Sequence, residues 1–302
     1  MDALCREILQ NWQVRKSKAE KLAFIDMMRQ CLPGLRVEEG GFPRCRNLVL
    51  GDAETAEVVF TAHYDTSARL PFPNVVTPKN ILLYLLYNIL IMLPFFALMA
   101  LLAWLLVPRL GMPGFLLSLW LPLGLMLYIF IFGPANPHTV NDNTSGVLTL
   151  IEIIRSMSEE ERARVCFVFF DHEENGLLGS GYFAALHKKQ MKNKLLVNFD
   201  CVSDGDSFLF VQSRKARKAY EEAIKAAFAP PEGKTALFER TSTAFYPSDQ
   251  ANFPVGVGVA ALNKHPVFGY YLSRIHTPRD TVLQEENIAF LAEGARKLAS
   301  GL

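Results

Sequence analysis

Hydrophobic and polar positions along the chain alternate between the period of a helix and that of a strand. From residue 3 to about residue 31, apolar residues recur every three or four positions, which predicts a helix. Pro33 and Gly34 end this pattern. Two short apolar runs, 46–50 and 58–62, then predict two strands. The side chains expected to face the core from the first helix are Leu4, Ile8, Trp12, Leu22, Ile25 and Met28.

The second half of the chain alternates apolar strands with amphipathic helices. The expected strands are 165–170, 195–199, 208–211 and 256–262. The expected helices are 145–157, 177–188, 216–227 and 286–298. Strands that alternate with helices of 10–15 residues indicate a sheet that helices cover on both faces, so the sequence predicts an α/β fold.

A long apolar block interrupts this alternation and divides into two segments, about 81–107 and 110–132, joined at Pro108 and Arg109. A helix that spans a bilayer needs about 20 apolar residues, and both segments exceed that length. The alternative is a buried helical hairpin in a large soluble core, but such helices rarely run this far without a charge. We therefore expect a transmembrane hairpin.

Net charge and its distribution sharpen this interpretation. The 302 residues carry 31 Lys and Arg against 30 Asp and Glu, a net charge of +1, which argues against a nucleic-acid partner. Charged residues make up 20% of the chain, below the roughly 25% usual for a soluble domain. The deficit lies between Asn80 and Asn141, where Arg109 is the only formal charge. Outside that block the composition is that of an ordinary soluble protein.

Polar residues that packing does not require gather where the predicted strands end. His63 and Asp65 close the second strand. Because positions i and i+2 of an extended chain face the same way, Asp65 can accept from one ring nitrogen of His63 while the other binds a metal. Asp142 stands in an Asn-Asp-Asn segment before a helix. An Asx turn with a helix cap explains that segment by itself, and a metal-bridging carboxylate is the alternative.

Further acids and a second histidine follow later apolar runs. Glu173 and Glu174 come directly after the strand 165–170, Asp200 follows the next strand, and His276 lies late in the chain. Adjacent carboxylates at the carboxyl end of a buried strand are costly unless they are paired or bound to metal. Ligands of open α/β sheets bind at that edge, so these residues together indicate a metal site.

Five ordered segments, AHYDT at 62–66, NDNTSG at 141–146, FDHEENG at 170–176, NFD at 198–200 and HTPRDT at 276–281, carry a family resemblance. Together they resemble the aminopeptidase Y and bacterial leucyl aminopeptidase family of co-catalytic di-zinc metallo-exopeptidases. The resemblance covers nearly all of the chain outside the apolar block. It implies a three-layer α/β/α fold with a central mixed, mostly parallel sheet, and hydrolysis of N-terminal residues from peptides.

The same resemblance implies a site for two Zn²⁺ ions. His63 and Asp200 would hold one ion, Glu174 and His276 the other, and Asp142 would bridge them. Two divalent ions about 3.5–4 Å apart need such a bridging carboxylate, and together they lower the pKa of a shared water. Imidazole and carboxylate ligands suit zinc, with Mn²⁺ or Co²⁺ as alternatives.

By the same resemblance, Glu173 would act as the general base for the metal-bridged water, and Asp65 would orient the first histidine. Tyr246 lies in a segment similar to the family's later Ser-Asp-His segment, in which Gln250 replaces the histidine. Tyr246 is a candidate contact to the oxyanion or the substrate, and a buried tyrosine of a turn is the equal alternative.

The apolar block falls between the first two motifs of the site. A domain formed from 1–79 and 139–302 can close only if the inserted segment 80–138 crosses the bilayer an even number of times, which two spans satisfy. The start of the chain lacks the apolar segment of a cleavable signal peptide. Together with Arg69 and Lys79 on the first flank, this predicts an integral membrane protein whose catalytic domain faces the cytoplasm.

The expected partners are a peptide with a free N-terminus and, through residues 81–132, the lipid bilayer. The basic run 187–194 is expected to be a solvated helix end, with contact to anionic lipid as the alternative. Two other functions remain open. One is glutaminyl-cyclase-like acyl transfer on a single-zinc site, against which the full second-metal set argues. The other is a non-catalytic receptor or scaffold domain, although no ligand and no base is missing here.

Overall fold

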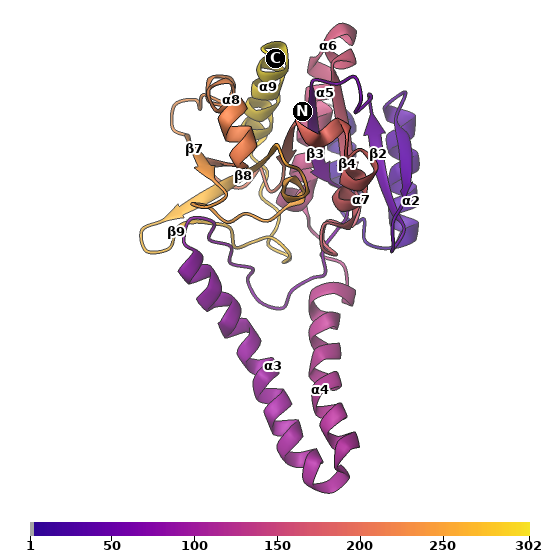
Figure 1. The fold of residues 1–302 in the computed structure, drawn as a ribbon, viewed down its shortest axis with the longest axis vertical. Coiled ribbons are helices and arrows are strands. Elements are labelled where there is room, and N and C mark those ends of the chain that lie inside the picture. The colour runs from indigo at the N-terminus through magenta and orange to yellow at the C-terminus, as the bar shows by residue number, and fades with distance from the viewer. Residues whose placement is uncertain (1–2) are drawn as a thin grey trace.

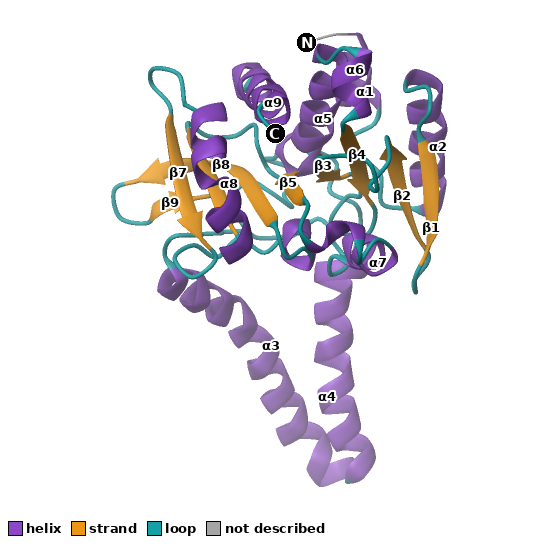
Figure 2. Ribbon diagram, turned by 45° about the horizontal axis from the view of Figure 1, so that its top comes forward, coloured by secondary structure: helices purple, strands orange, loops and turns teal. Residues whose placement is uncertain are grey.

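The computed structural model describes residues 3–302, which form a nine-stranded sheet with helices on both faces (Figures 1 and 2). The expectation of no signal-type segment falls partly on Met1 and Asp2, which lie outside the described residues. Along the sheet the strands run in the order β1-β2-β4-β3-β5-β8-β6-β7, and β9 pairs with β8. Their bounds are β1 Arg36–Gly40, β2 Cys45–Leu50, β3 Val58–His63, β4 Val165–Phe170, β5 Leu195–Phe199, β6 Ser207–Gln212, β7 Thr235–Arg240, β8 Gly256–His265 and β9 Gly269–Tyr271.

Parallel strands form the centre of the sheet, where β4, β3, β5 and β8 lie side by side. The pairs β1–β2, β2–β4, β6–β8 and β8–β9 are antiparallel and lie toward the edges. The predicted α/β fold with a mixed sheet is therefore confirmed. All four central strands share one carboxyl edge, where the candidate site lies.

The helices have the bounds α1 Ala3–Asn11, α2 Lys18–Cys31, α3 Ile81–Leu110, α4 Met112–Leu127, α5 Ser145–Ser156, α6 Glu159–Ala163, α7 Leu178–Leu186, α8 Arg214–Ala227 and α9 Glu285–Ser300. Short π or 3₁₀ turns add η1 Tyr128–Phe132, η2 Val140–Thr144, η3 Gln190–Lys192 and η4 Asp249–Asn252. Strand β4 shows how the layers form, because its successive side chains point to opposite faces. Val165, Phe167 and Phe169 join the core that α5 and α9 cover, and Cys166, Val168 and Phe170 join the core beneath α7.

Most predicted elements are confirmed, including β4 and β5 at the expected bounds. The outer strands β1 and β7 were not predicted from the sequence. Both are edge strands whose side chains are half-buried or exposed, so the apolar pattern of a central strand is lacking. The three-residue β9 and the single-turn α6 were not predicted either, because they are too short to show a repeat of apolar residues.

The first predicted helix is wrong in its continuity. Helix α1 ends at Asn11, and a new helix, α2, begins after Ser17. The Ser17 side chain accepts from the Glu20 N–H while the Glu20 carboxylate accepts from the Ser17 N–H, a capping box that starts α2. This break rotates the apolar face of α2, so Leu22 is 38% exposed and Phe24 is buried in its place.

Helices α3 and α4 project from the domain as a hairpin, on the side opposite α6, α9 and the C-terminus (Figure 1). None of the residues of α3 is buried, and Trp104 is 73% exposed. The hairpin is therefore not part of a soluble core. Both segments, Ile81–Leu110 and Met112–Phe132, are long and apolar enough to cross a membrane.

The predicted junction at Pro108 and Arg109 is wrong by two residues. Helix α3 continues through both residues, and the chain turns at Gly111, which has a φ of 60°. Glycine adopts this left-handed conformation without steric cost. Gly114 then allows close approach of the two helices, because a Cβ there would lie 2.4 Å from the Leu106 carbonyl oxygen.

The basic run 187–194 lies far from the hairpin. Its last residue, Lys194, donates from Nζ to the carbonyl oxygens of Ala53 and Glu54, in the turn that precedes β3. That turn is at the amino edge of the central strands, whereas the hairpin joins the domain at the carboxyl edge. The expected solvated helix end therefore describes this run better than contact with lipid.

Candidate metal centre

All of the predicted ligands meet at the carboxyl edge of the central strands. With the proposed base Glu173 they come from five separate segments, which explains why their spacing in the sequence is wide. The positions are His63 at the end of β3, Asp142 in η2, Glu173 and Glu174 in the loop after β4, Asp200 after β5, and His276 in the loop after β9.

Asp142 stands between the two imidazole rings. Its Oδ1 lies 3.3 Å from His63 Nε2, and its Oδ2 lies 2.9 Å from His276 Nε2. The Asp280 carboxylate holds the backbone in this position, because it accepts from the Asn141 and Asp142 N–H groups at 2.7 and 2.9 Å. One carboxylate can thus serve two ligand groups at once.

Two groups of three ligand atoms share Asp142. In the first, His63 Nε2 also lies 3.6 Å from Asp200 Oδ1. In the second, His276 Nε2 also lies 3.2 Å from Glu174 Oε2. Glu173 Oε2 is 4.0 Å from His63 Nε2, and Glu173 forms a third group with His63 and Glu174 that does not include Asp142.

The polar atoms of this centre fit divalent metal better than they fit one another. Both ring nitrogens of His63 and Glu174 Oε1 are buried and have no hydrogen-bond partner within residues 3–302. Among the protein groups alone, burial raises the pKa of Glu174 to about 8 and that of Glu173 well above its usual range. A divalent cation supplies partners to such atoms and favours ionised carboxylates, so the residues present fit metal ligation.

Asp65 lies where its spacing from His63 predicts. Its Oδ1 is 3.5 Å from His63 Nδ1, and its two oxygens accept from the Glu173 and Glu174 N–H groups at 3.0 and 3.2 Å. Burial opposes ionisation of Asp65, but the contact with His63 outweighs it and lowers the pKa of Asp65 to about 2. A single carboxylate therefore faces the histidine ring and holds the loop that carries the two glutamates.

A cavity of about 180 Å³ opens over the cluster. Tyr246 lines it and donates from its hydroxyl to the Asp200 carbonyl oxygen at 3.1 Å. Gln250 donates to the Tyr246 carbonyl oxygen and supports the turn. The cavity wall also includes Tyr84, which comes from the first turn of α3.

Sequence reasoning missed several residues around this centre. Arg15 is completely buried in the break between α1 and α2, and its guanidinium donates to Thr144 Oγ1 at 3.2 Å. Asp249 is buried as well, and this burial raises its pKa to about 7. Asp280 could have been found, because it lies in the same short motif as His276. No local pattern distinguishes Arg15 from a surface arginine.

Comparison with solved structures supports the fold. The LapA aminopeptidase of Legionella pneumophila is 12% identical over 98% of this chain and 69% of its own, with a TM-score of 0.57. A zinc-dependent exopeptidase of Parabacteroides distasonis is also 12% identical, over 98% of this chain and 96% of its own, with a TM-score of 0.56. A glutaminyl cyclase of Porphyromonas gingivalis is 14% identical over 98% and 95%, with a TM-score of 0.55.

At these identities the likeness concerns the fold. No curated protein sequence matches this chain. The family model described as peptidase family M28 matches residues 129–296, which is more than half of the chain and contains every candidate ligand except His63. The chain therefore belongs to peptidase family M28.

Proposed function

We propose that this protein is a membrane-anchored, zinc-dependent aminopeptidase that removes N-terminal residues from peptides. The observation that carries the proposal is the placement of Asp142, which faces His63 with one oxygen and His276 with the other. Membership of a peptidase family gives this geometry its chemical context. The arrangement favours the two-metal aminopeptidases that the sequence resembles.

The proposed ligands follow the two groups that share Asp142. His63 and Asp200 belong to one metal position, Glu174 and His276 to the other, and Asp142 to both. Bound zinc lowers the pKa of a coordinated water and polarises a carbonyl group. Mn²⁺ or Co²⁺ would suit the same donors.

Glu173 is the proposed general base. Its carboxylate lies 4.0 Å from His63 Nε2 and is absent from the two groups that share Asp142. With both metals held by those two groups, Glu173 is left to take a proton from water and deliver it to the leaving amine. Asp65 acts on this glutamate as a positioning residue, because it accepts from the Glu173 N–H while it faces His63 Nδ1. Tyr246 is proposed to contact the substrate from the cavity wall.

A free N-terminus is the proposed substrate end, as in the aminopeptidases that the sequence resembles. Among the described residues, the charged lining of the cavity consists of Asp142, Glu173, Glu174, Asp200 and His276. Glu173 is the carboxylate of this lining that is not assigned to either metal position, so it is the group left to meet an α-ammonium group.

The hairpin is proposed to span the membrane and to divide the catalytic domain into 1–79 and 139–302, with 80–138 as the insertion. Support comes from the exposed apolar surface of α3 and α4. Since Tyr84 of α3 lines the cavity, substrates would reach the site close to the lipid surface. The flanking Arg69 and Lys79 favour a domain that faces the cytoplasm.

A panel of aminoacyl amides, assayed with and without chelator, tests the proposal. The wild-type protein should release amino acids, and chelator should abolish the release. Glu173→Gln should keep its metal and lose turnover by about 10²–10⁴-fold, as expected for a general base. Glu222→Gln, at a side chain 89% exposed, is the matched control and should keep full activity.

Three outcomes would contradict the proposal in different ways. Cyclisation of N-terminal glutamine without amide hydrolysis would favour acyl transfer of the glutaminyl-cyclase type. Bound zinc without any turnover would favour a non-catalytic receptor or scaffold. Unchanged activity of Glu173→Gln would exclude this residue as the base.

A further inference from the structure

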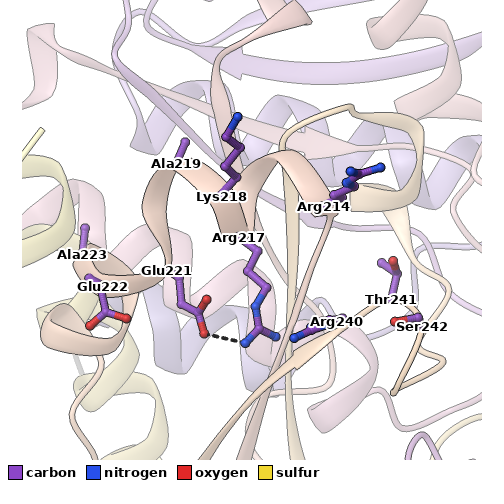
Figure 3. A pocket seen from close by; sticks show the side chains of 10 residues that line it. All are labelled: Arg214, Arg217, Lys218, Ala219, Glu221, Glu222, Ala223, Arg240, Thr241 and Ser242. Carbon is purple, nitrogen blue, oxygen red and sulfur yellow. Dashed lines mark ion pairs between the residues drawn. The ribbon is translucent and has the colours of Figure 1, made fainter.

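A groove of about 840 Å³ lies outside the catalytic cavity, between α8 and the end of β7 (Figure 3). Arg214, Arg217 and Lys218 line it from the first turns of α8, and Arg240 lines it from β7. The helix leaves room for the groove because its facing residues there include two small side chains, Ala219 and Ala223.

The groove keeps an excess of positive charge. Four basic residues line it against two acidic ones, Glu221 and Glu222, which leaves a net charge of +2 (4 − 2). Arg217 pairs with Glu221 at 2.8 Å, but Glu221 also pairs with Lys225 at 3.0 Å. Across residues 3–302, Arg214, Lys218 and Arg240 form no ion pair. Figure 3 shows the guanidinium of Arg217 directed toward Arg240, an arrangement of like charges that an anion between them would stabilise.

Three contacts join the segment 239–245, which carries the groove residues Arg240, Thr241 and Ser242, to the start of the hairpin. The Lys79 ammonium group, two residues before α3, pairs with Glu239, the neighbour of Arg240. The Phe245 N–H donates to the Pro78 carbonyl oxygen at 2.8 Å, and the Phe245 ring lies 5.5 Å from the Tyr84 ring. The end of β7 also points toward the start of α3 (Figure 2). If α3 enters the bilayer, the groove lies at the level of the lipid headgroups.

We propose that this groove binds the phosphate group of an anionic phospholipid in the leaflet next to the catalytic domain. Guanidinium groups donate pairs of hydrogen bonds to phosphate oxygens, and the Thr241 and Ser242 hydroxyls at the same wall add further donors. Basic residues beside a membrane-spanning helix are attracted to anionic leaflets. The proposal rests on the membrane-spanning hairpin of the proposed function but not on the peptidase activity.

The bound headgroup would hold the domain against the membrane in one orientation. The hairpin joins the domain by the connections before α3 and after η1, and the groove adds a contact on the β7 side of the sheet. Since the catalytic cavity shares Tyr84 with the hairpin, this contact would also keep the cavity mouth at the lipid surface.

Native mass spectrometry of the full-length protein in neutral detergent tests the proposal. The probes are dioctanoyl phosphatidylglycerol, dioctanoyl phosphatidylcholine and inorganic phosphate. The groove variant combines Arg214→Gln, Lys218→Gln and Arg240→Gln. The matched control combines Lys188→Gln, Lys189→Gln and Lys192→Gln, which removes the same charge from the exposed basic run 187–194, outside the groove.

We expect phosphatidylglycerol to bind the wild-type protein in preference to phosphatidylcholine, and the groove variant to bind it about tenfold more weakly or worse. The control variant should bind it like the wild type, and all three proteins should hydrolyse a soluble aminoacyl amide at the same rate.

Equal loss of phosphatidylglycerol binding in both triple variants, or no loss in either, would overturn the proposal. Full competition by inorganic phosphate would also overturn it, because the ligand would then be free phosphate. A protein without peptidase activity that still shows the lipid preference would refute only the proposed function.

Discussion

The ring of Tyr84 lies 5.5 Å from the ring of Phe245. Tyr84 belongs to the first turn of the projecting helix α3, and Phe245 precedes the cavity residue Tyr246. The hairpin and the candidate site are therefore packed against each other at one place. This contact makes the inserted segment a part of the cavity wall rather than a remote anchor.

The substitution Tyr84→Ala should impair substrate binding more than the chemical step. It removes an aromatic wall of the cavity without touching a candidate ligand, so we expect KM to rise by about tenfold, equivalent to about 1.4 kcal/mol, with a smaller change in kcat. Tyr84→Phe should restore most of the binding because it keeps the ring. Leu85→Ala, at an exposed neighbour outside the cavity lining, is the control. A loss of kcat alone in Tyr84→Ala would contradict a role in the substrate pocket.

The bridging geometry of Asp142 predicts a distinctive pattern of metal loss. Asp142→Asn should weaken both metal positions, because its two oxygens face one ligand group each. Asp65→Asn should weaken mainly the position of His63, by about 10–100-fold, as expected for a partner that orients a ligand. Dialysis against graded chelator, followed by metal analysis, measures both effects. Two ions retained by Asp142→Asn at wild-type affinity would exclude the bridge.

The strand ends could be predicted from the sequence because buried parallel strands are continuously apolar and stop abruptly. In β4 six apolar residues lead directly to Asp171, and this contrast locates both the element and the site. The break that buries Arg15 could not be predicted in this way. No apolar period surrounds it, and its guanidinium bonds to groups far along the chain, the Tyr64 carbonyl oxygen and Thr144 Oγ1, 49 and 129 positions away. The capping box at Ser17 and Glu20 was the one local signal of that break.

A buried ion pair next to the site predicts a large effect on stability. Lys21 Nζ of α2 lies 2.5 Å from Asp171 Oδ1, and the two side chains are 5% and 0% exposed. Lys21→Met would leave the Asp171 charge buried without its counterion, which costs about 3–5 kcal/mol. Thermal and denaturant unfolding should show this loss, whereas Lys18→Met on the exposed side of α2 should stay within about 0.5 kcal/mol of the wild type.

The double variant Lys21→Met with Asp171→Asn separates pairing from packing. Removing the second charge should recover part of the lost stability, because the remaining polar groups are neutral. Asp171 Oδ2 also accepts from the Arg46 N–H at 3.0 Å, so recovery should be incomplete. If the double variant instead lost the sum of the free energies of unfolding lost by Lys21→Met and Asp171→Asn alone, the two side chains would act independently.

Membrane crossing and sidedness can be tested by labelling single cysteines. Among the five native cysteines only Cys31 is exposed, so Cys31→Ser gives a background with little reactivity toward an impermeant maleimide. In that background, Arg109→Cys places a thiol next to the hairpin turn, and Lys189→Cys places one at an exposed position of the domain. In intact cells we expect labelling of Arg109→Cys and protection of Lys189→Cys, with the reverse in inverted membrane vesicles.

Labelling of both cysteines from the same side would show that the hairpin does not cross the bilayer. The opposite pattern would keep the two spans and place the catalytic domain outside the cytoplasm.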